Sequence, residues 1–136
     1  MTQRFSTDVL IIGGGTAGAS AALKLAEHVR VTVLCKGGVE SSSSHWAQGG
    51  VAVVTDPADS LEAHSNDTRS AGAGLCDPEI VTFTVAHAKE AITALLDWGI
   101  EFDRVDNEIH LTREGGHSYR RIMHVADATG KAITKT

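Results

Sequence analysis

The sequence is poor in cysteine, in long hydrophobic runs and in clustered positive charge. Its two cysteines, Cys35 and Cys76, lie far apart without C-x-x-C spacing, so we expect reduced thiols in or near the core rather than a disulfide or a metal site. The net charge is -5 and lysine and arginine are scattered, so the chain lacks the basic stripe of a nucleic-acid-binding protein. No run of about 18 apolar residues and no charged-then-apolar leader is present, which predicts a cytoplasmic protein that does not enter a membrane.

A glycine-rich turn near the N-terminus organises the rest of the chain, whose 136 residues are one domain's worth. The apolar run Asp8–Ile12 predicts a strand buried on both faces of a parallel sheet, and the alanine-rich segment from Thr16 to about His28 predicts a helix. Three glycines between them have the G-x-G-x-x-G spacing: Gly13, Gly15 and Gly18. This spacing gives a tight turn, close approach of a pyrophosphate, and close packing of helix on strand. We therefore expect a dinucleotide at the helix N-terminus; a merely flexible turn is the alternative.

The second strand ends without the acidic residue of an NAD site. Alternating valines predict this strand over Val29–Leu34, which completes a right-handed strand-helix-strand unit. A site of the NAD type has Asp or Glu here to hold the ribose hydroxyls, but Cys35 and Lys36 follow the strand. Lys36 would either meet a phosphate or stand in solvent.

A loop of small polar residues, Glu40–Gly50, comes next. Its serine run alone is typical of a flexible linker. Trp46 and the pair Gly49-Gly50 stand directly before an apolar strand over Val51–Val54, which favours a loop folded closely against a flat group. The two glycines would let backbone N–H groups come near a ligand atom.

The middle of the chain has structural patterns. Asp59 and Glu62 fit a capping box for a helix that reaches about Ala71, and Asp77-Pro78 begins a second helix that ends at Gly99. Apolar residues recur in that second helix at helical spacing and predict a core stripe: Val81, Val85, Ala88, Ile92 and Leu95. The segment 127–131 predicts the cap and first turn of a further helix.

Polar residues near the C-terminus give no firm site by themselves. Three histidines are spaced by seven: His110, His117 and His124. No second ligand pair at metal spacing accompanies them, so we expect no metal site. Arg120 and Arg121 are expected to be solvated.

Three motifs together carry a resemblance to a known family. They are D-V-L-I-I-G-G-G-T-A-G at 8–18, S-S-H-W-A-Q-G-G at 43–50, and L-T-R-E-G-G-H-S at 111–118. From Asp8 to Lys131 the chain resembles the FAD-dependent succinate dehydrogenase and fumarate reductase flavoproteins, and within them the aspartate oxidases. The resemblance implies an α/β fold, a Rossmann-type FAD-binding domain with a parallel sheet and flanking helices. Residues 1–136 would be the truncated N-terminal part of this domain, without the capping and C-terminal helical domains. The fragment alone is expected to have no enzymatic activity.

The resemblance implies a non-covalent FAD site. The expected cofactor contacts lie in the glycine turn, after the second strand and in the serine loop: Gly13, Gly14, Gly15, Thr16, Ala17, Gly18, Lys36, Ser43, Ser44, His45, Trp46, Ala47, Gln48, Gly49 and Gly50. Succinate dehydrogenases carry a flavin-linked histidine at the position of Ser43, and His45 is out of register with it. Aspartate oxidases typically have Ser-Lys after the second strand, which Cys35-Lys36 resembles.

The resemblance also implies that Glu114 recognises the substrate. Dicarboxylate enzymes usually have an apolar aromatic residue here, whereas a carboxylate can pair with the ammonium of L-aspartate. An exposed loop carboxylate is the alternative. The implied reaction converts L-aspartate to iminoaspartate in NAD biosynthesis, with oxygen or fumarate as electron acceptor and the catalytic residues in the missing capping domain.

The sequence leaves two alternative functions open, and the resemblance implies one protein partner. The alternatives are a fumarate reductase or succinate dehydrogenase flavoprotein and a catalytically silent dinucleotide-binding module. The expected protein partner is quinolinate synthase, the next enzyme of the pathway.

Overall fold

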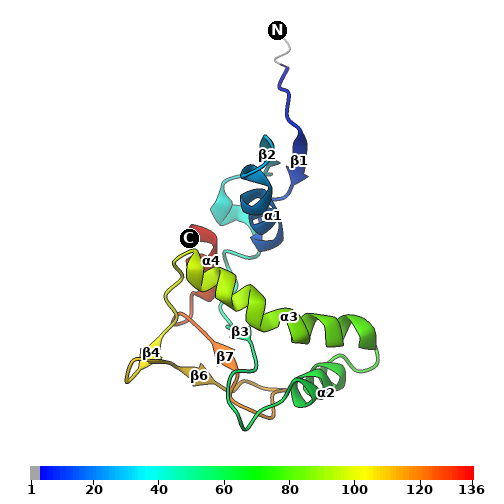
Figure 1. The fold of residues 1–136 in the computed structure, drawn as a ribbon, viewed down its shortest axis with the longest axis vertical. Helices are drawn as coiled ribbons and strands as arrows, with labels where there is room; N and C mark the ends of the chain where they lie inside the picture. The colour runs from blue at the N-terminus through cyan, green and yellow to red at the C-terminus, as the bar shows by residue number, and fades with distance from the viewer. Residues whose placement is uncertain (1–3) are drawn as a thin grey trace. The chain divides into compact units, whose positions relative to one another are not determined.

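The computed structural model describes residues 4–136, which divide into two compact units. The first unit runs to Ala47 and includes Gly130–Lys135, and the second comprises Gln48–Thr129 and Thr136. Figure 1 labels the helices and strands of both units. No helix within residues 4–136 has the length and apolar character needed to cross a membrane.

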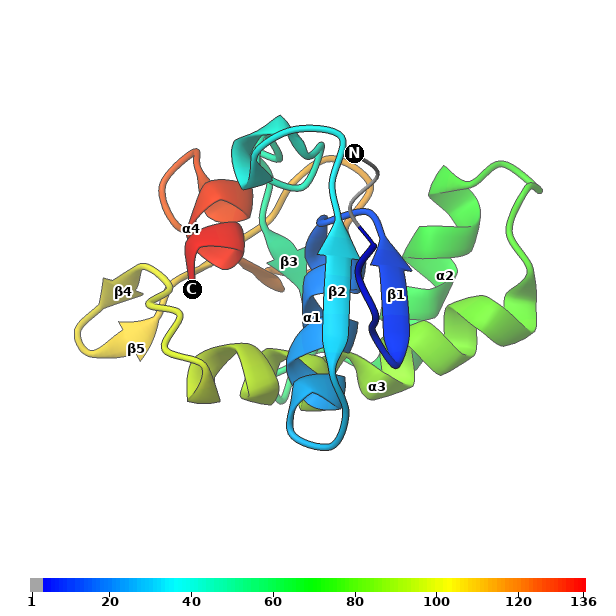
Figure 2. The ribbon, with the colours of Figure 1, turned by 90° about the horizontal axis from the view of Figure 1, so that it is seen from above.

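A strand-helix-strand motif forms the first part of the first unit. Strand β1 (Val9–Ile12) pairs in parallel with β2 (Val31–Leu34), and helix α1 (Thr16–Ala26) packs against both strands. Figure 2 shows β1 and β2 side by side, with α1 along them. The predicted α/β class with a parallel sheet is confirmed.

The boundaries of α1 and β2 differ slightly from the prediction. The N–H groups of His28 and Val29 both donate to the carbonyl of Leu25, so a tight turn follows the helix and β2 begins only at Val31. Asp8 fixes the start of the sheet, because its carboxylate accepts from the backbone N–H and the guanidinium of Arg30.

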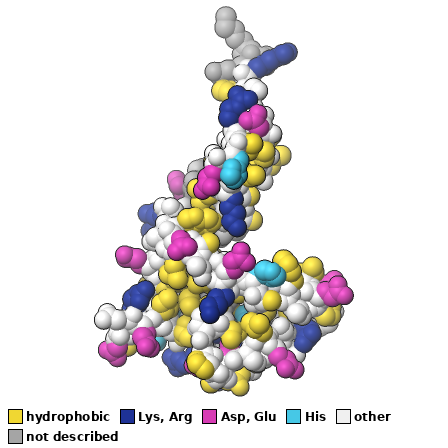
Figure 3. All heavy atoms as spheres, viewed as in Figure 1, with side chains coloured by type: hydrophobic (Ala, Val, Ile, Leu, Met, Phe, Trp, Pro, Cys, Tyr) yellow, Lys and Arg dark blue, Asp and Glu magenta, His cyan; other side chains and the backbone are white. Residues whose placement is uncertain are grey.

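The predicted burial of the first strand on both faces is wrong within the described residues. Side chains of β1 alternate in exposure, and Leu10 and Ile12 remain 53% and 80% exposed. Successive side chains of a strand point to opposite faces, and α1 covers one face of this two-stranded sheet. Apolar side chains are also exposed in the second unit, as at Leu75 and Phe83, and Figure 3 shows such apolar surface between charged side chains.

A compact loop completes the first unit. A 3-10 turn, η1 (Val39–Ser41), follows β2, and the N–H groups of His45, Trp46 and Ala47 then bond to the carbonyls of the three residues Ser42–Ser44. Helix α4 (Thr129–Lys135) lies against this loop, since the N–H of Gly130 donates to the carbonyl of Ala47 at 2.9 Å. The helix whose cap and first turn were predicted at 127–131 is confirmed, and it begins at Thr129.

Short antiparallel strands and two helices form the second unit. Strands β3 (Val51–Ala52), β7 (Ile122–Met123) and β6 (Leu111–Thr112) make a sheet in the order β3-β7-β6. Strands β4 (Arg104–Val105) and β5 (Glu108–Ile109) make a separate hairpin. Its turn residues Asp106 and Asn107 both have positive φ, as a two-residue hairpin of the primed type requires.

Helices α2 (Leu61–Ala71) and α3 (Pro78–Asp97) pack against each other. The start of α3 is as predicted, because the Asp77 carboxylate accepts from the N–H groups of Glu79 and Ile80. The end is also as predicted, with Gly99 at a φ of +98°. The capping box of Asp59 with Glu62 is wrong: Ser60 caps α2 by accepting from the N–H of Ala63 at 3.0 Å.

The core of the second unit joins α3 to the sheet. Three residues of the predicted stripe are buried, Val81, Val85 and Ile92, whereas Ala88 and Leu95 are half-buried. The other buried apolar residues come from β7, from the residue after β3 and from the segment after α3: Val53, Ile100, Phe102, Ile122 and Met123. Both cysteines are free and half-buried.

Candidate functional site

The glycines of the first turn have separate structural tasks. Gly13 has a φ of +111°, which favours glycine, and its N–H donates to the carbonyl of Leu34 at 2.9 Å. A Cβ on Gly18 would overlap the carbonyl oxygen of Gly13 and would lie 3.3 Å from Cγ2 of Ile11. Helix α1 therefore comes this close to β1 only because residue 18 is glycine.

The N-terminus of α1 is covered by the serine loop. Gly15 is the N-cap residue and has no side chain to accept a hydrogen bond. The hydroxyl of Ser44 instead accepts from the N–H of Thr16 at 3.1 Å, across 28 residues of sequence. A Cβ on Gly15 would lie 3.1 Å from the same hydroxyl oxygen, so the glycine leaves room for the Ser44 hydroxyl at the helix N-terminus.

A pocket of about 360 Å³ lies at this N-terminus. This volume is within the range of about 300–1,000 Å³ that is usual for ligand pockets. Three segments line it, the glycine turn, the end of β2 and the serine loop: Gly13, Gly14, Gly15, Cys35, Lys36, Gly37, Gly38, Ser41, Ser42, Ser43 and Ser44. The predicted residues of the glycine turn, Lys36, Ser43 and Ser44 are thus brought together. Sequence reasoning missed five residues of this lining: Cys35, Gly37, Gly38, Ser41 and Ser42. A glycine pair near the end of a strand was a signal for Gly37 and Gly38.

The other predicted cofactor residues of the first unit lie outside this lining. Thr16, Ala17 and Gly18 form the first turn of α1. His45 Nδ1 lies 3.0 Å from the hydroxyl of Thr134, and the indole N–H of Trp46 donates to the carbonyl of Glu40 at 2.8 Å. His45, Trp46 and Ala47 therefore shape the loop, and their contact with a cofactor stays a prediction.

The predicted residues Gln48, Gly49, Gly50 and Glu114 belong to the second unit. A Cβ on Gly50 would overlap the backbone of Met123, so this glycine lets the loop pass close to β7. A Cβ on Gly49 would lie 3.9 Å from Oε2 of Glu114, which places that carboxylate beside the glycine pair. Two of the three motifs thus meet within the second unit.

The loop that carries Glu114 presents its carboxylate to solvent. Glu114 is exposed, and its carbonyl accepts from the N–H of His117 across a turn in which Gly116 has a φ of +85°. Within residues 4–136 no hydrogen bond or ion pair engages the Glu114 carboxylate. The group is available to a cationic ligand.

Arg121 is buried, and the prediction that it is solvated is wrong. Its guanidinium is fully buried and donates to both oxygens of Asp59, each at 2.7 Å, and to Oδ2 of Asp67 at 2.7 Å. A buried guanidinium requires such paired carboxylates. The two partners precede it by 62 and 54 residues, so no local pattern linked them. Arg120 is exposed, and its Nε–H donates to the carbonyl of Leu111.

These ion pairs change the ionisation of the carboxylates. Burial by itself would raise the pKa of Asp59, but the hydrogen bonds from Arg121 outweigh it and lower that pKa. The hydroxyl and backbone N–H of Ser118, with Arg121, lower the pKa of Asp67 to about 2. Both carboxylates are therefore ionised, and Asp59 raises the pKa of the Arg121 guanidinium.

Four histidines of the second unit lie in two pairs. His110 Nδ1 lies 3.2 Å from His124 Nε2, and His124 Nδ1 lies 3.1 Å from Asp103. His64 is buried and packs near the ring of His117; burial, followed by the charge of Arg121, lowers the pKa of His64. Within residues 4–136 no group of three or more histidine, cysteine or acidic side chains is placed to hold a metal ion.

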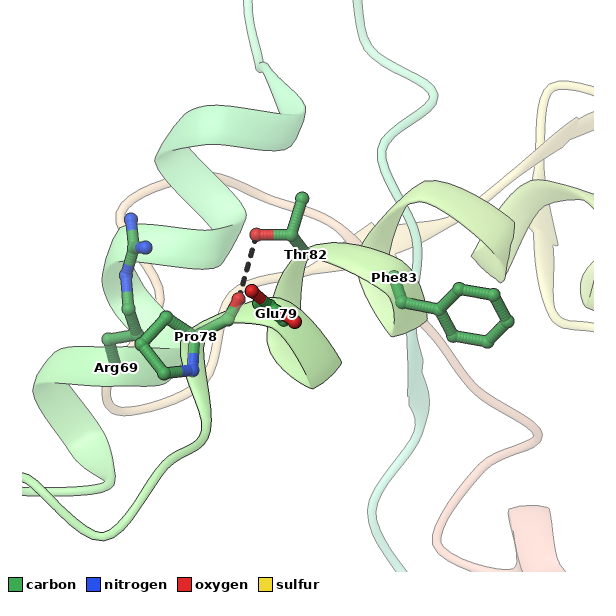
Figure 4. Close-up of a pocket in the computed structure, with 5 residues that line it drawn as sticks. All are labelled: Arg69, Pro78, Glu79, Thr82 and Phe83. Carbon is green, nitrogen blue, oxygen red and sulfur yellow. Dashed lines mark hydrogen bonds between the residues drawn. The ribbon is translucent and has the colours of Figure 1, made fainter.

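A second, larger pocket lies beside the start of α3. Its volume is about 470 Å³, and Figure 4 shows its lining residues: Arg69, Pro78, Glu79, Thr82 and Phe83. Two of its polar side chains are already engaged, because the Thr82 hydroxyl donates to the carbonyl of Pro78 and Arg69 donates to Asn66. None of the three motifs contributes to this pocket.

Comparison with known proteins agrees with these features. A family model described as an FAD binding domain matches residues 8–136. The chain is similar to the L-aspartate oxidases of Pseudomonas aeruginosa (52% identity, covering 100% of this chain and 27% of the relative) and Yersinia pestis (51%, 96% and 25%). It is also similar to the solved quinol fumarate reductase of E. coli, with a TM-score of 0.89 and 32% identity over 98% of this chain and 24% of that chain. The chain spans about a quarter of the length of the curated relatives that it matches.

Proposed function

The chain belongs to the FAD-binding family of succinate dehydrogenase and fumarate reductase flavoproteins, and on this premise we propose that it serves an L-aspartate oxidase. The reaction is the oxidation of L-aspartate to iminoaspartate in NAD biosynthesis, with oxygen or fumarate as the electron acceptor. Residues 1–136 would supply the first part of the FAD-binding domain. The capping domain, with the catalytic base, and the C-terminal helical domain would lie outside this chain.

The observation that carries the proposal is the unpaired carboxylate of Glu114. L-Aspartate differs from succinate by an ammonium group, and an ammonium that leaves water requires a charged or strongly accepting partner. Glu114 supplies such a partner from a loop that meets the glycine pair at Gly49. An apolar side chain at this position would suit succinate or fumarate better.

The residues at the N-terminus of α1 fit the pyrophosphate of FAD. Gly15 lines the pocket there, and the Ser44 hydroxyl, which accepts from the N–H of Thr16, is a polar group at the same place. Unpaired N–H groups and the positive end of the helix dipole favour a phosphate there. Lys36 adds a cation to the same pocket.

The roles of this chain's residues are binding and orientation. Bound FAD would supply the two-electron acceptor for the oxidation. The glycine turn and Ser44 would hold its phosphates, and Ser43, which cannot form the histidyl link of succinate dehydrogenases, leaves it non-covalently bound. Glu114 would orient the substrate through its ammonium group. The proton acceptor is expected outside residues 1–136.

A fumarate reductase is the second candidate, because the fold is shared with the E. coli enzyme at a TM-score of 0.89. Glu114 and Ser43 favour the oxidase. The proposal includes a cytoplasmic location and a complex with quinolinate synthase. The complex would allow direct transfer of the product to the next enzyme, because an imine hydrolyses in water.

The test is Glu114→Gln in the full-length enzyme. The substitution keeps the shape but removes the charge, and a hydrogen bond to a charged group is worth about 1.5–3 kcal/mol. We expect kcat/KM for aspartate to fall by roughly ten- to a hundredfold, and fumarate reduction, which involves no amine, to fall far less. Glu101→Gln, at another exposed glutamate of the same unit, is the matched control. A parallel loss of both activities would contradict the proposal.

A further inference from the structure

The loop 113–118, which carries Glu114, is tied down at its C-terminal end by one carboxylate. The backbone N–H of Ser118 donates to Oδ2 of Asp67 and its hydroxyl donates to Oδ1, each at 2.7 Å. Asp67 lies on α2, which is not adjacent to the loop in sequence. The bonds therefore fix the loop to a regular element of the same unit.

Arg121 holds both flanks of this loop. Its backbone N–H donates to the carbonyl of Thr112, at the end of β6 where the loop begins. Its guanidinium donates to Asp67, and thereby supports the carboxylate that receives Ser118. The bidentate contact with Asp59 fixes the orientation of the guanidinium.

The same arginine sets the hydrogen-bonding state of His117. The guanidinium nitrogen NH1 lies 3.3 Å from Nδ1 of His117. A guanidinium has donors only, so Nδ1 must accept, and the ring proton of the neutral imidazole must be on Nε2. His117 thus offers an Nε2–H donor from the loop that also carries Glu114.

We propose that Ser118, Asp67 and Arg121 are positioning residues that hold the loop 113–118 in the conformation in which Glu114 receives the substrate ammonium. The loop contains Gly115 and Gly116, and glycine has the largest conformational freedom to lose on ordering. Without its anchor the loop would populate other conformations, and the apparent affinity for substrate falls with the competent fraction. This inference rests on the proposed function, because it takes Glu114 as the ammonium partner.

The test uses Ser118→Ala in the full-length, FAD-loaded enzyme. The variant removes one exposed hydroxyl and its bond to Asp67, and keeps the bond from the backbone N–H. We expect KM for aspartate to rise by roughly three- to tenfold, the size of one hydrogen bond, with kcat and FAD content unchanged. Ser118→Thr restores the hydroxyl and should return KM to the wild-type value. Thr93→Ala, which removes an exposed hydroxyl from α3, should leave KM unchanged.

The outcomes separate this inference from the proposed function. An enzyme that oxidises aspartate, but whose KM is unchanged in Ser118→Ala, overturns the positioning role alone. So does a loss of FAD or of kcat in step with the rise in KM, because that pattern indicates general damage to the fold. A wild-type enzyme that binds FAD without oxidising aspartate overturns the proposed function and this inference together.

Discussion

Substitution of Gly15 by valine tests whether the pocket at the N-terminus of α1 is the phosphate site. The backbone at Gly15 has φ -74° and ψ -179°, an extended conformation that valine also adopts, so no backbone strain is expected. The new Cβ would lie 3.1 Å from the Ser44 hydroxyl, which a loop side chain can relieve by a shift of a few tenths of an ångström. The loss of glycine from an N-cap position costs about 1 kcal/mol. The fold should therefore survive.

The ligand should not tolerate the same change. The isopropyl group would enter the pocket that Gly13, Gly14 and Gly15 line, where the pyrophosphate is expected to bind. Each charge-assisted hydrogen bond that is lost costs about 1.5–3 kcal/mol. This corresponds to a roughly ten- to a hundredfold weaker affinity for FAD per bond.

The assay is a titration of FAD into the deflavinated full-length enzyme, followed by flavin fluorescence, with far-ultraviolet circular dichroism on the same samples. Ala21→Val, at an exposed position of the same helix, is the control and should retain the affinity of the wild type. Wild-type affinity for FAD in folded Gly15→Val would refute the reasoning, because the turn would then face something other than the cofactor.

Three further predictions concern the stability of the fold. Gly18→Ala should lower the free energy of unfolding by about 1–3 kcal/mol in a denaturant titration, because the methyl group overlaps the carbonyl of Gly13. Arg121→Met should cost about 3–5 kcal/mol in the same titration, since it leaves Asp59 buried without its counter-charge, and adding Asp59→Leu should recover much of the loss. Acid titration of the unfolding midpoint should show the effect of Asp67: its pKa is lowered from 3.8 to about 2, so its stabilisation is complete above pH 3.8 and is lost as the pH falls through about 2. In Asp67→Asn the unfolding midpoint should depend less on pH between 3.8 and about 2.

Local patterns predicted the parts of the fold whose cause lies within a few residues. The glycine turn was predictable because a positive φ at Gly13 and a close helix-strand contact at Gly18 each require glycine at a fixed spacing. The start and end of α3 were predictable because Asp77 and Gly99 are sufficient for capping by themselves.

Features that depend on distant partners could not be predicted in this way. The sequence Arg120-Arg121 does not indicate that only Arg121 is buried. The carboxylates that pair with Arg121 are Asp59, before α2, and Asp67, on α2. The same partner explains the error at α2: Asp59 is engaged by Arg121, and Ser60 takes the capping role. The exposure of Leu10 and Ile12 depends on how many elements cover the sheet, which a strand's own sequence does not specify.

The most direct measurement of the central claim is the reduction of the bound flavin by candidate substrates under anaerobic conditions. The full-length enzyme, loaded with FAD, is mixed separately with L-aspartate and with succinate, and the visible flavin absorbance is followed. Recognition of the ammonium by Glu114 predicts that L-aspartate bleaches the flavin and that succinate does not. Bleaching by succinate, with none by L-aspartate, would contradict the account.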